Sequence, residues 1–444
     1  MVTHEIYESG SKEEGQDSEV WGGRVLIRRW AQGMAREGHE VVVTSPSEEV
    51  DGVEKQNMEW GTLVHLGVEP LHEGVNPMWI LHRRPSLYSQ AKRYLEAYQP
   101  DVVFGHSLPR CASILEAASD LKVPIVFSVL DFSHLCGRTF LVDSEGDMCS
   151  GPESVEKCRS CLQHDHPTWR QVGMRVAETD LGRRALRGFL GSARAESFNL
   201  KNGIKEAFSV RHEFQSWVTT WLATSRHVAD MLERYGVSGS DIRFTPTFGL
   251  EDDRMDPSPG PPPFNGRPVN IGYFGRISPE KGVGMLADVL GEVSADNFEW
   301  TIISYSVDDS TKAELRTRSG LPKNHIHFVE GVSGAALNDH IAKLDVCVVP
   351  SRWPETGPLT LLEAMAQNVP CICNDLSANA RVIDDGVNGR VFETGNKASL
   401  RAAIQQVLDD PSLLNKWREN VDVTGERSEK YVEALCSALK NAVQ

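Results

Sequence analysis

The sequence predicts an α/β protein with two domains, each a parallel β-sheet covered by helices on both faces. The first observation is that runs that are apolar throughout, such as 102–104 and 346–349, alternate with amphipathic helical stretches. This alternation is typical of parallel strands buried on both faces. The second observation is that the alternation occurs twice. The third is a Pro- and Gly-rich stretch at 255–268, DPSPGPPPFNGRP, which cannot join a helix or a sheet ladder and indicates a linker.

The length and composition are those of an ordinary globular protein. The 444 residues suffice for two or three domains with separate cores. The net charge of −16 disfavours nucleic acid or an anionic membrane as a long-range partner. No apolar run approaches the length of a membrane span, and the N-terminus has no signal-peptide pattern. We therefore expect a cytoplasmic protein whose nine cysteines are mostly reduced.

The first domain is expected to span 1–254 and to be interrupted by an insertion at 131–215. Its strands are expected at 2–6, 41–44, 100–104, 125–129, 217–223 and near 242. Its helices are expected at 22–37, 86–98, before 119 and at 228–235. The region before 86 is expected to be irregular. Within the insertion, cysteines precede one arginine-rich helical stretch at 169–194.

The second domain is expected to span 269–428. Its strands are expected near 269–274, 300–305, 325–329, 345–349, 370–373 and 390–392. A last helix, 429–444, is expected to pack back on the first domain. Two doubly wound domains leave a cleft between the carboxyl ends of their strands, where ligands of such sheets bind.

The stretch 350–366, PSRWPETGPLTLLEAMA, follows a strand and opens a helix. Pro358 suits the first helical position. The amides of Leu359 and Thr360 would then point out of the positive helix end, a ready site for a phosphate. Glu355 and Glu363 bracket this end with a Glu-x7-Glu spacing. The alternative is an ordinary solvated face that Glu363 shares with Thr360 and Gln367.

The stretch 275–282, GRISPEKG, is a second candidate for anion binding. Ser278 suits an N-cap and Pro279 a first helical residue. Lys281 would then lie in the first turn, where a cation opposes the helix dipole, and Arg276 lies just before it. A bound diphosphate would compensate both cations. The alternative is two solvated surface side chains.

These two stretches resemble the motifs of the retaining GT-B glycosyltransferases of the GT4 family (glycosyl transferases group 1), and the likeness covers nearly the whole chain. Gly22-Gly23 resembles the family's glycine-rich loop, 224–228 the segment that closes the first domain, and 385–389 a late turn. The resemblance implies GT-B architecture, in which two Rossmann-like domains face each other across a cleft, the first on the acceptor side and the second on the nucleotide-sugar side.

The resemblance also implies the catalytic residues. Arg276 and Lys281 would bind the diphosphate of a nucleotide-sugar and stabilise it as the leaving group. Glu355 would contact the transferred sugar. Fixed positive charge where negative charge develops is the main catalytic requirement for such a leaving group. The implied reaction retains the anomeric configuration, needs no catalytic metal and takes a glycan or lipid-linked acceptor in polysaccharide or glycoconjugate biosynthesis.

Other matched positions are implied to bind the donor. Glu363 would accept hydrogen bonds from the ribose, and the amides of Leu359 and Thr360 would contact the phosphates. Gly22 and Gly23 would let the backbone of the first domain approach the donor.

Three departures from the family pattern bear on these roles. Leu130 stands where the family usually has a His that reaches the donor sugar; His134 is a candidate substitute, with a structural histidine as the alternative. Pro358 stands in place of a common Gly. The first strand is short. Two other functions therefore stay open, a catalytically weak nucleotide-sugar-binding partner subunit and a sugar-nucleotide epimerase of the same fold.

The insertion holds four cysteines in the pattern C-x12-C-x8-C-x2-C. These are Cys136, Cys149, Cys158 and Cys161. Four thiolates can complete a tetrahedral structural zinc site, and some family members carry a similar insertion. An iron–sulfur cluster, which takes the same number of ligands, and reduced free thiols are the alternatives. The other five cysteines lie in apolar strands or on helices and are expected to be small core residues.

Arginines recur through the second half of the insertion. They are Arg170, Arg175, Arg183, Arg184, Arg187 and Arg194. A solvated helical face is the simplest interpretation. The alternative is a surface for an anionic acceptor or for lipid, which would make the protein peripheral at the inner face of the membrane.

Overall fold

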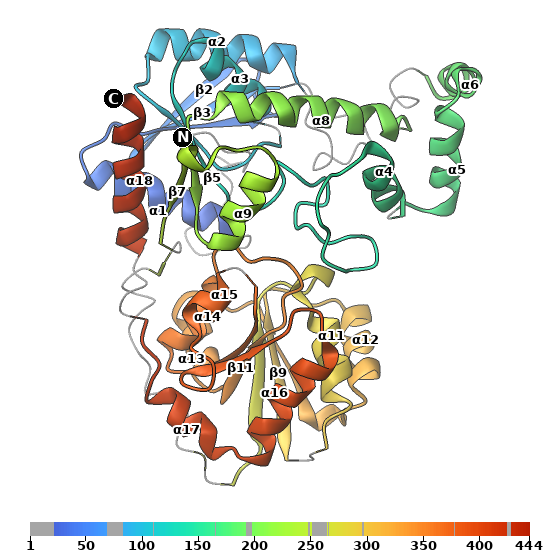
Figure 1. Ribbon diagram of the computed structural model, residues 1–444, viewed down its shortest axis with the longest axis vertical. Helices are drawn as coiled ribbons and strands as arrows, with labels where there is room; N and C mark the ends of the chain where they lie inside the picture. Colours follow the sequence, from blue (N-terminus) through green and yellow to red (C-terminus); the bar gives the residue numbers. More distant parts are fainter. Residues whose placement is uncertain are drawn as a thin grey trace.

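The computed structural model describes residues 22–68, 83–109, 111–164, 166–191, 198–246, 249–250, 264, 266–294, 297–376, 378–423 and 428–444. They form two α/β lobes arranged along the long axis of the molecule (Figure 1). The strand expected at 2–6 and most of the linker at 255–268 lie outside these residues. None of the described helices combines the length and the apolarity needed to cross a membrane.

The first lobe contains strands β1 (Val42–Ser47), β2 (Val53–Met58), β3 (Gly61–Gly67), β4 (Val103–Gly105), β5 (Ile125–Ser128), β6 (Thr220–Ala223) and β7 (Ile242–Phe244). Strands β4 to β7 form a parallel sheet in sequence order, and β1 pairs in parallel with β3. The hairpin β2–β3 was not predicted. Strand β2, VEKQNM, is almost wholly exposed at a sheet edge, so no apolar run marks it in the sequence.

Helices cover these strands where the sequence predicts them. They are α1 (Gly22–Arg36), α2 (Pro85–Tyr98), α3 (Ala112–Asp120) and α9 (Arg226–Arg234). A short 3-10 turn, η1 (Gly239–Asp241), precedes β7. Gly38, with a φ of +84°, lies just beyond the end of α1, as expected for a glycine that closes a helix.

The insertion forms helices α4 (Val155–His164), α5 (Thr168–Ala177), α6 (Asp180–Leu190) and α8 (Leu200–Trp217). The helical stretch expected at 169–194 is divided into two helices, α5 and α6. The break has a local cause: the Thr179 hydroxyl accepts the amide of Gly182 at 3.0 Å and caps α6. Helices α5 and α6 project from the body of the lobe (Figure 1).

The second lobe contains one six-stranded parallel sheet in the order β10-β9-β8-β11-β12-β13. Its strands are β8 (Val269–Phe274), β9 (Phe298–Ser304), β10 (Ile326–Glu330), β11 (Val346–Val349), β12 (Cys371–Asn374) and β13 (Gly389–Phe392). Each lies within two residues of its predicted position. The order reverses between β8 and β11, and ligands of doubly wound sheets bind at such a switch point.

Helices lie on both faces of this sheet. They are α11 (Val283–Leu290), α12 (Asp309–Ser319), α13 (Gly334–Ile341), α14 (Leu359–Ala366), α15 (Asn379–Val382), α16 (Lys397–Asp409) and α17 (Ser412–Arg418). The 3-10 turns η2 (Pro279–Lys281) and η3 (Lys323–His325) complete the lobe. The two-domain doubly wound fold class is thereby confirmed.

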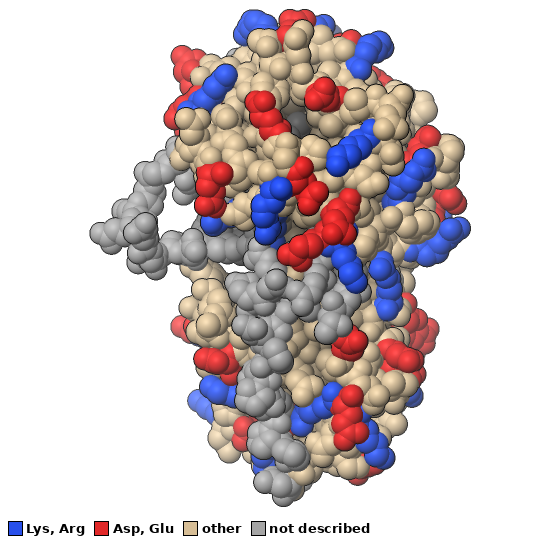
Figure 2. Space-filling view, turned by 90° about the vertical axis from the view of Figure 1, so that its left-hand side faces the viewer, with Lys and Arg blue, Asp and Glu red and all other residues tan. Residues whose placement is uncertain are grey.

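The last helix, α18 (Ser428–Val443), packs on the first lobe against α1 and β5. The Tyr431 hydroxyl lies 2.6 Å from Ser128 Oγ, and its ring stacks on Trp30. Gly33 permits this close approach, because a Cβ there would lie 2.7 Å from the Val432 side chain. On the side that carries these two helices, acidic and basic side chains are interspersed over both lobes (Figure 2).

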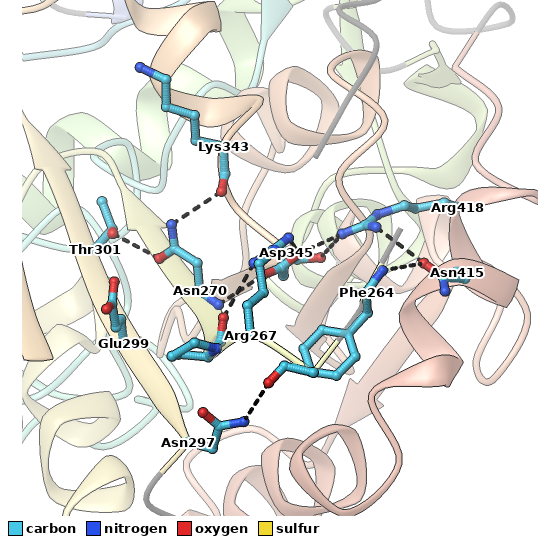
Figure 3. A network of polar contacts seen from close by, with 12 residues as sticks. Phe264, Arg267, Asn270, Asn297, Glu299, Thr301, Lys343, Asp345, Asn415 and Arg418 are labelled. Atoms are coloured by element: carbon cyan, nitrogen blue, oxygen red, sulfur yellow. Dashed lines mark hydrogen bonds and ion pairs between the residues drawn. The ribbon is translucent and has the colours of Figure 1, made fainter. Parts of the chain in front are cut away.

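A buried carboxylate joins the amino-terminal ends of the central strands of the second sheet, opposite the carboxyl ends that carry the candidate site (Figure 3). Asp345, with no exposed surface, directly precedes β11. It accepts two bonds from Arg267 at 2.5 and 2.7 Å and one from Arg418 at 2.9 Å. The amide of Asn270 donates to it at 2.9 Å. Asp345 thus joins β8, β11 and α17 at one point.

Candidate active site

The loop after β8 is pressed against the loop after β11. The amide of Arg352 donates to the carbonyl of Glu280 at 2.8 Å. Gly282 has a φ of +73°, and a Cβ there would lie 2.0 Å from the Pro350 carbonyl oxygen. Only glycine fits this conformation and this contact. The two stretches that the sequence singles out therefore converge at the switch point.

A short 3-10 helix begins at Pro279 with Ser278 at its N-cap position, as predicted, but it does not continue as an α-helix. Residues 279–281 form the 3-10 turn η2, and α11 begins after Gly282. Ser278 makes no capping bond to the backbone; its hydroxyl donates to Glu280 Oε1 at 2.6 Å. Lys281 thus lies in the single turn of η2, directly before α11.

The helix after the second stretch begins one residue later than predicted. Pro358 is the residue before α14, and the amide of Leu359 donates to the Gly357 carbonyl at 2.9 Å. The amide predicted to be unpaired at Leu359 is therefore occupied. Thr360 differs, since within the described part of the chain no acceptor takes its amide. Gly275 lies beside Thr360, since a Cβ added at Gly275 would be 3.8 Å from Thr360 Oγ1.

Glu355 is buried, with 5% of its surface exposed, and is held by three donors on a single oxygen. Oε1 lies 2.6 Å from Lys281 Nζ, 2.6 Å from Ser351 Oγ and 3.0 Å from Trp353 Nε1. Among the described residues no donor contacts Oε2. One carboxylate oxygen is therefore fixed by the protein, while the other remains available to a ligand.

The two predicted cations differ in their surroundings. Lys281 is mostly buried, pairs with Glu355 and lies 5.2 Å above the Trp353 ring. A merely solvated surface lysine is thus excluded at this position. Arg276 has 45% of its side chain exposed and pairs with Glu280 at 3.1 Å. Its guanidinium lies 5.6 Å above the ring of Phe140, a residue of the first lobe.

Phe140 and Trp353 are site residues that the sequence did not reveal. Their rings meet edge to face with centroids 4.9 Å apart, across the two lobes. Trp353 could have been noticed as the aromatic residue two positions before Glu355. Nothing in the sequence marks Phe140, because its contact with Arg276 depends on how the insertion folds.

Further contacts join the lobes beside this pair. The Thr356 hydroxyl donates to the Leu130 carbonyl, and the Thr224 hydroxyl donates to the Thr356 carbonyl. Arg381 donates to the carbonyl of Thr224 at 3.0 Å, and Arg352 pairs with Asp147 at 2.7 Å. The segment at 224–228 and the position of Leu130 thus border the site.

Three other residues are predicted to bind the nucleotide-sugar, namely Gly22, Gly23 and Glu363. Gly22 and Gly23 are the first two residues of α1, as the sequence predicts for the helix start. Glu363 is half-buried in α14, four residues before Gln367, which is only 1% exposed. A fully solvated face shared by these two residues is therefore wrong.

His134 does not replace the missing family histidine. It is buried among the rings of Phe127, Phe132 and Trp221. Burial, together with the nearby charge of Arg211, lowers the pKa of His134 to about 3. Among the described residues neither ring nitrogen has a hydrogen-bond partner. The side chain belongs to the core of the first lobe, which is the structural alternative.

The four cysteines of the insertion converge, but they do not form the predicted zinc site. Burial raises the pKa of the Cys158 thiol to about 11, and the other three thiols, Cys136, Cys149 and Cys161, raise it further. Within the described residues no group of three or more His, Cys, Asp or Glu side chains is placed to hold a metal ion. The Cys149 sulfur instead contacts the backbone of Gly151. The same finding applies to the iron–sulfur alternative.

The other five cysteines are core residues, as predicted. They are Cys111, Cys347, Cys371, Cys373 and Cys436, each at most 3% exposed.

Family models match both parts of the chain. Residues 22–247 match the model described as "Glycosyl transferase 4-like domain", and residues 257–423 match "Glycosyl transferases group 1".

Two curated relatives are similar to this chain at 27% and 28% identity. The chain is 27% identical over 341 residues to a phosphatidyl-myo-inositol mannosyltransferase of Mycobacterium leprae, covering 74% of this chain and 81% of the relative. It is 28% identical over 223 residues to a GDP-mannose-dependent alpha-mannosyltransferase of Mycolicibacterium smegmatis, covering 48% of this chain and 55% of the relative.

Solved structures share the fold at low identity. HepE of Anabaena in complex with UDP superposes with a TM-score of 0.61 at 14% identity, covering 96% of this chain and 98% of that chain. The catalytic domain of starch synthase IV from Arabidopsis thaliana, bound to ADP and acarbose, gives 0.61 at 13% identity, covering 100% and 98%.

Two parallel-sheet lobes that meet at a switch point carrying Lys281 and Glu355 define a protein of the GT-B class. The chain belongs to the glycosyltransferase family described by the "Glycosyl transferase 4-like domain". The resemblance drawn from the sequence is confirmed at this level.

Proposed function

We propose that the protein transfers a sugar, with retention, from a nucleotide-diphosphate-sugar to a glycan or lipid-linked acceptor. The observation that carries this proposal is the contact of 2.6 Å between Lys281 and Glu355 at the switch point. It places the cation expected to bind the diphosphate beside the carboxylate expected to bind the transferred sugar. These two groups are adjacent across the bond that breaks in such a donor.

Departure of the diphosphate is assisted by fixed positive charge. Lys281 and Arg276 supply two cations at the end of β8, and the amide of Thr360 supplies a hydrogen-bond donor at the positive end of α14. Such groups stabilise the charge that develops on the leaving oxygen without having to reorganise. No step requires a metal ion, because the cations themselves neutralise the phosphates.

Glu355 is positioned to hold the sugar rather than to attack it. Three donors fix Oε1, so the carboxylate is oriented before the ligand arrives. Oε2 then accepts a hydrogen bond from a hydroxyl of the sugar. Glu363, half-buried in α14, accepts hydrogen bonds from the ribose hydroxyls. Gly22 and Gly23, which have no side chains, let the backbone at the start of α1 approach the donor. Retention follows from attack on the face of the sugar that the diphosphate leaves.

The setting of the reaction belongs to the same proposal. The relatives include mannosyltransferases, one of them named for a phosphatidyl-myo-inositol acceptor. We place the protein in polysaccharide or glycoconjugate biosynthesis in the cytoplasm, at the inner face of the membrane. The solved neighbours hold UDP in one case and ADP in another, so the base is left to experiment.

A panel of nucleotide-sugars tests the proposal. A donor at a hundred times its Kd should stabilise the fold by about 2.7 kcal/mol, measured as a rise in melting temperature. The donor that stabilises should then be consumed, and NMR of the product should show the anomeric configuration of the donor. Lys281→Ala should reduce the stabilisation at the same donor concentration. If none of the nucleotide-sugars stabilises the protein, the proposal is wrong.

The same panel separates the other two functions. Stabilisation by a donor that is neither hydrolysed nor transferred, with any acceptor offered, would indicate a binding subunit. Release of a changed sugar-nucleotide without an acceptor would indicate an epimerase.

A further inference from the structure

Exposed apolar side chains are concentrated on helices α5 and α6. Of the eleven large apolar residues that are exposed in the described part of the chain, five lie on these two helices. They are Trp169, Val172, Val176, Leu181 and Phe189, at 67%, 53%, 41%, 80% and 89% exposure. Single exposed apolar residues need no explanation, but a cluster of this size marks an interaction site.

The spacing of these residues aligns them along each helix. On α5, Trp169, Val172 and Val176 recur three and four residues apart and therefore share one face. On α6, Leu181 and Phe189 lie eight residues apart, with Ala185 between them.

The opposite side of α6 is already used inside the molecule. Leu186 and Leu190 pack on the small core that contains Met174 and Phe198. Helix α6 thus has two apolar stripes. Leu186 and Leu190 pack on the small core, whereas Leu181 and Phe189 lie outside it and are exposed.

Helices α5 and α6 together form the α5–α6 hairpin, whose net charge is opposite in sign to that of the whole chain. Between 166 and 191 there are five arginines against two acidic residues, in a protein of net charge −16. Both acids are engaged: Glu178 pairs with Arg159 at 2.6 Å, and Asp180 pairs with Arg183. The cationic surface therefore exceeds what the hairpin's own acids neutralise.

Three arginines of the two helices are exposed. They are Arg175, Arg184 and Arg187. Helical spacing places Arg175 beside Val172 on α5 and Arg184 beside Leu181 on α6. By contrast, the side of the molecule shown in Figure 2 carries both signs interspersed, and the hairpin lies on the other side (Figure 1).

We propose that the α5–α6 hairpin docks the protein on an anionic lipid bilayer. Trp, Leu and Phe on one stripe with Arg beside it is the composition of helices that lie in the plane of a membrane interface. The apolar side chains would enter the boundary between headgroups and acyl chains, and the arginines would contact anionic headgroups. A solvated arginine face alone leaves the exposure of Leu181 and Phe189 without a reason. This inference rests on the membrane placement in the proposed function and names the surface responsible for it, but its test does not depend on the donor chemistry.

Vesicle flotation without any donor tests the docking. The full chain should float with vesicles of phosphatidylglycerol and phosphatidylcholine in equal parts, and much less with phosphatidylcholine alone. Leu181→Ser with Phe189→Ser should weaken binding by about tenfold or more, because both side chains lose their apolar burial. Arg175→Ala with Arg184→Ala should weaken it by about fivefold per arginine at low salt.

Matched controls keep the test specific to the hairpin. Val53→Ser with Phe244→Ser removes two exposed apolar side chains elsewhere, and Arg36→Ala with Lys323→Ala removes two exposed cations elsewhere. Neither pair should change flotation. The proposal is overturned if the full chain does not float with anionic vesicles, or if the controls lower binding as much as the hairpin variants. It is also overturned if sedimentation shows an oligomer that the Leu181 and Phe189 substitutions dissociate.

Discussion

Lys281 Nζ lies 2.6 Å from Glu355 Oε1, so the two residues expected to bind adjacent parts of the donor are paired with each other. In this pair each charge neutralises the other, so neither the mostly buried lysine nor the buried carboxylate is left without a counter-charge. A diphosphate would take part of the lysine's charge, while Ser351 and Trp353 would still hold Oε1. The site is therefore organised before binding rather than assembled by it.

The first prediction concerns the two cations. Lys281→Ala and Arg276→Ala should each weaken nucleoside diphosphate binding by about 1.5–3 kcal/mol, because each removes a charge-assisted hydrogen bond. The bare nucleoside should bind nearly as before. Isothermal titration calorimetry would measure both ligands, with Lys323→Ala as the control for a lost surface charge. An unchanged diphosphate affinity in the double variant would show that these cations do not bind it.

The second prediction separates the two glutamates. Glu363→Ala should weaken diphosphate and intact donor alike, by about 1.5–3 kcal/mol, because the ribose is common to both ligands. Glu355→Gln should lower turnover and affinity for the intact donor. It should not lower affinity for the diphosphate, since it also releases Lys281 from its pair. Calorimetry of both variants with both ligands decides the matter. Equal losses of diphosphate affinity would mean that the assigned roles are wrong.

The third prediction concerns Trp353. Trp353→Phe keeps a ring against Phe140 and Lys281 but removes the N–H that Glu355 Oε1 accepts at 3.0 Å. The carboxylate should be less well oriented, with a loss of about 1–3 kcal/mol in kcat/KM for the donor. Diphosphate affinity should hardly change. Steady-state kinetics beside calorimetry would test this, and a loss confined to the diphosphate would contradict it.

The fourth prediction concerns acid stability. In the folded state the pKa of His134 is lowered to about 3, against an ordinary value of 6.5. Between these values the unfolded chain binds a proton that the folded chain does not. The free energy of unfolding should therefore fall as the pH drops below about 6.5, by on the order of a few kcal/mol in all.

His134→Phe should flatten this fall, because the aromatic box of Phe127, Phe132 and Trp221 can accept a ring without a titrating group. Urea unfolding at several pH values would measure it. His212→Gln, at an exposed position of α8, is the control and should leave the pH dependence as it is in the natural chain. The interpretation fails if the two variants behave alike.

The fifth prediction concerns the buried carboxylate at the base of the second sheet. Asp345→Ala leaves Arg418 and Arg267 without their common partner and should destabilise the fold by about 3–5 kcal/mol. Glu292→Gln removes the half-exposed pair with Arg401 and should change stability by about 0–1 kcal/mol. Urea unfolding compares the two, and a similar small effect of both would show that the network is not stabilising.

The sequence predicted the second lobe well for a physical reason. Strands buried on both faces must be apolar throughout, so β11 and β12 are visible as short apolar runs. Strand β2 carries polar side chains at an exposed edge, so periodicity does not reveal it. The break at Thr179 was missed because one capping hydroxyl is a weak signal within an arginine-rich stretch.

The site was predicted residue by residue, but its contacts were not. Lys281 and Glu355 were identified separately, 74 positions apart, and their pairing depends on two loops meeting at the switch point. Phe140 belongs to the other lobe and to no motif. The spacing of the four cysteines indicated that they converge, but spacing does not determine whether sulfur atoms point at a common centre.

The return of α18 to the first lobe has a mechanical consequence. The chain crosses between the lobes twice. The first crossing lies between β7, which ends at Phe244, and Leu250, which packs in the core of the second lobe. The second follows residue 423, and beyond it Tyr431 lies against Ser128 in the first lobe. Two connections restrict how one lobe can turn relative to the other. A rotation that admits a donor or releases a spent diphosphate would also have to break the direct contacts between the lobes, such as that of Thr356 with Leu130.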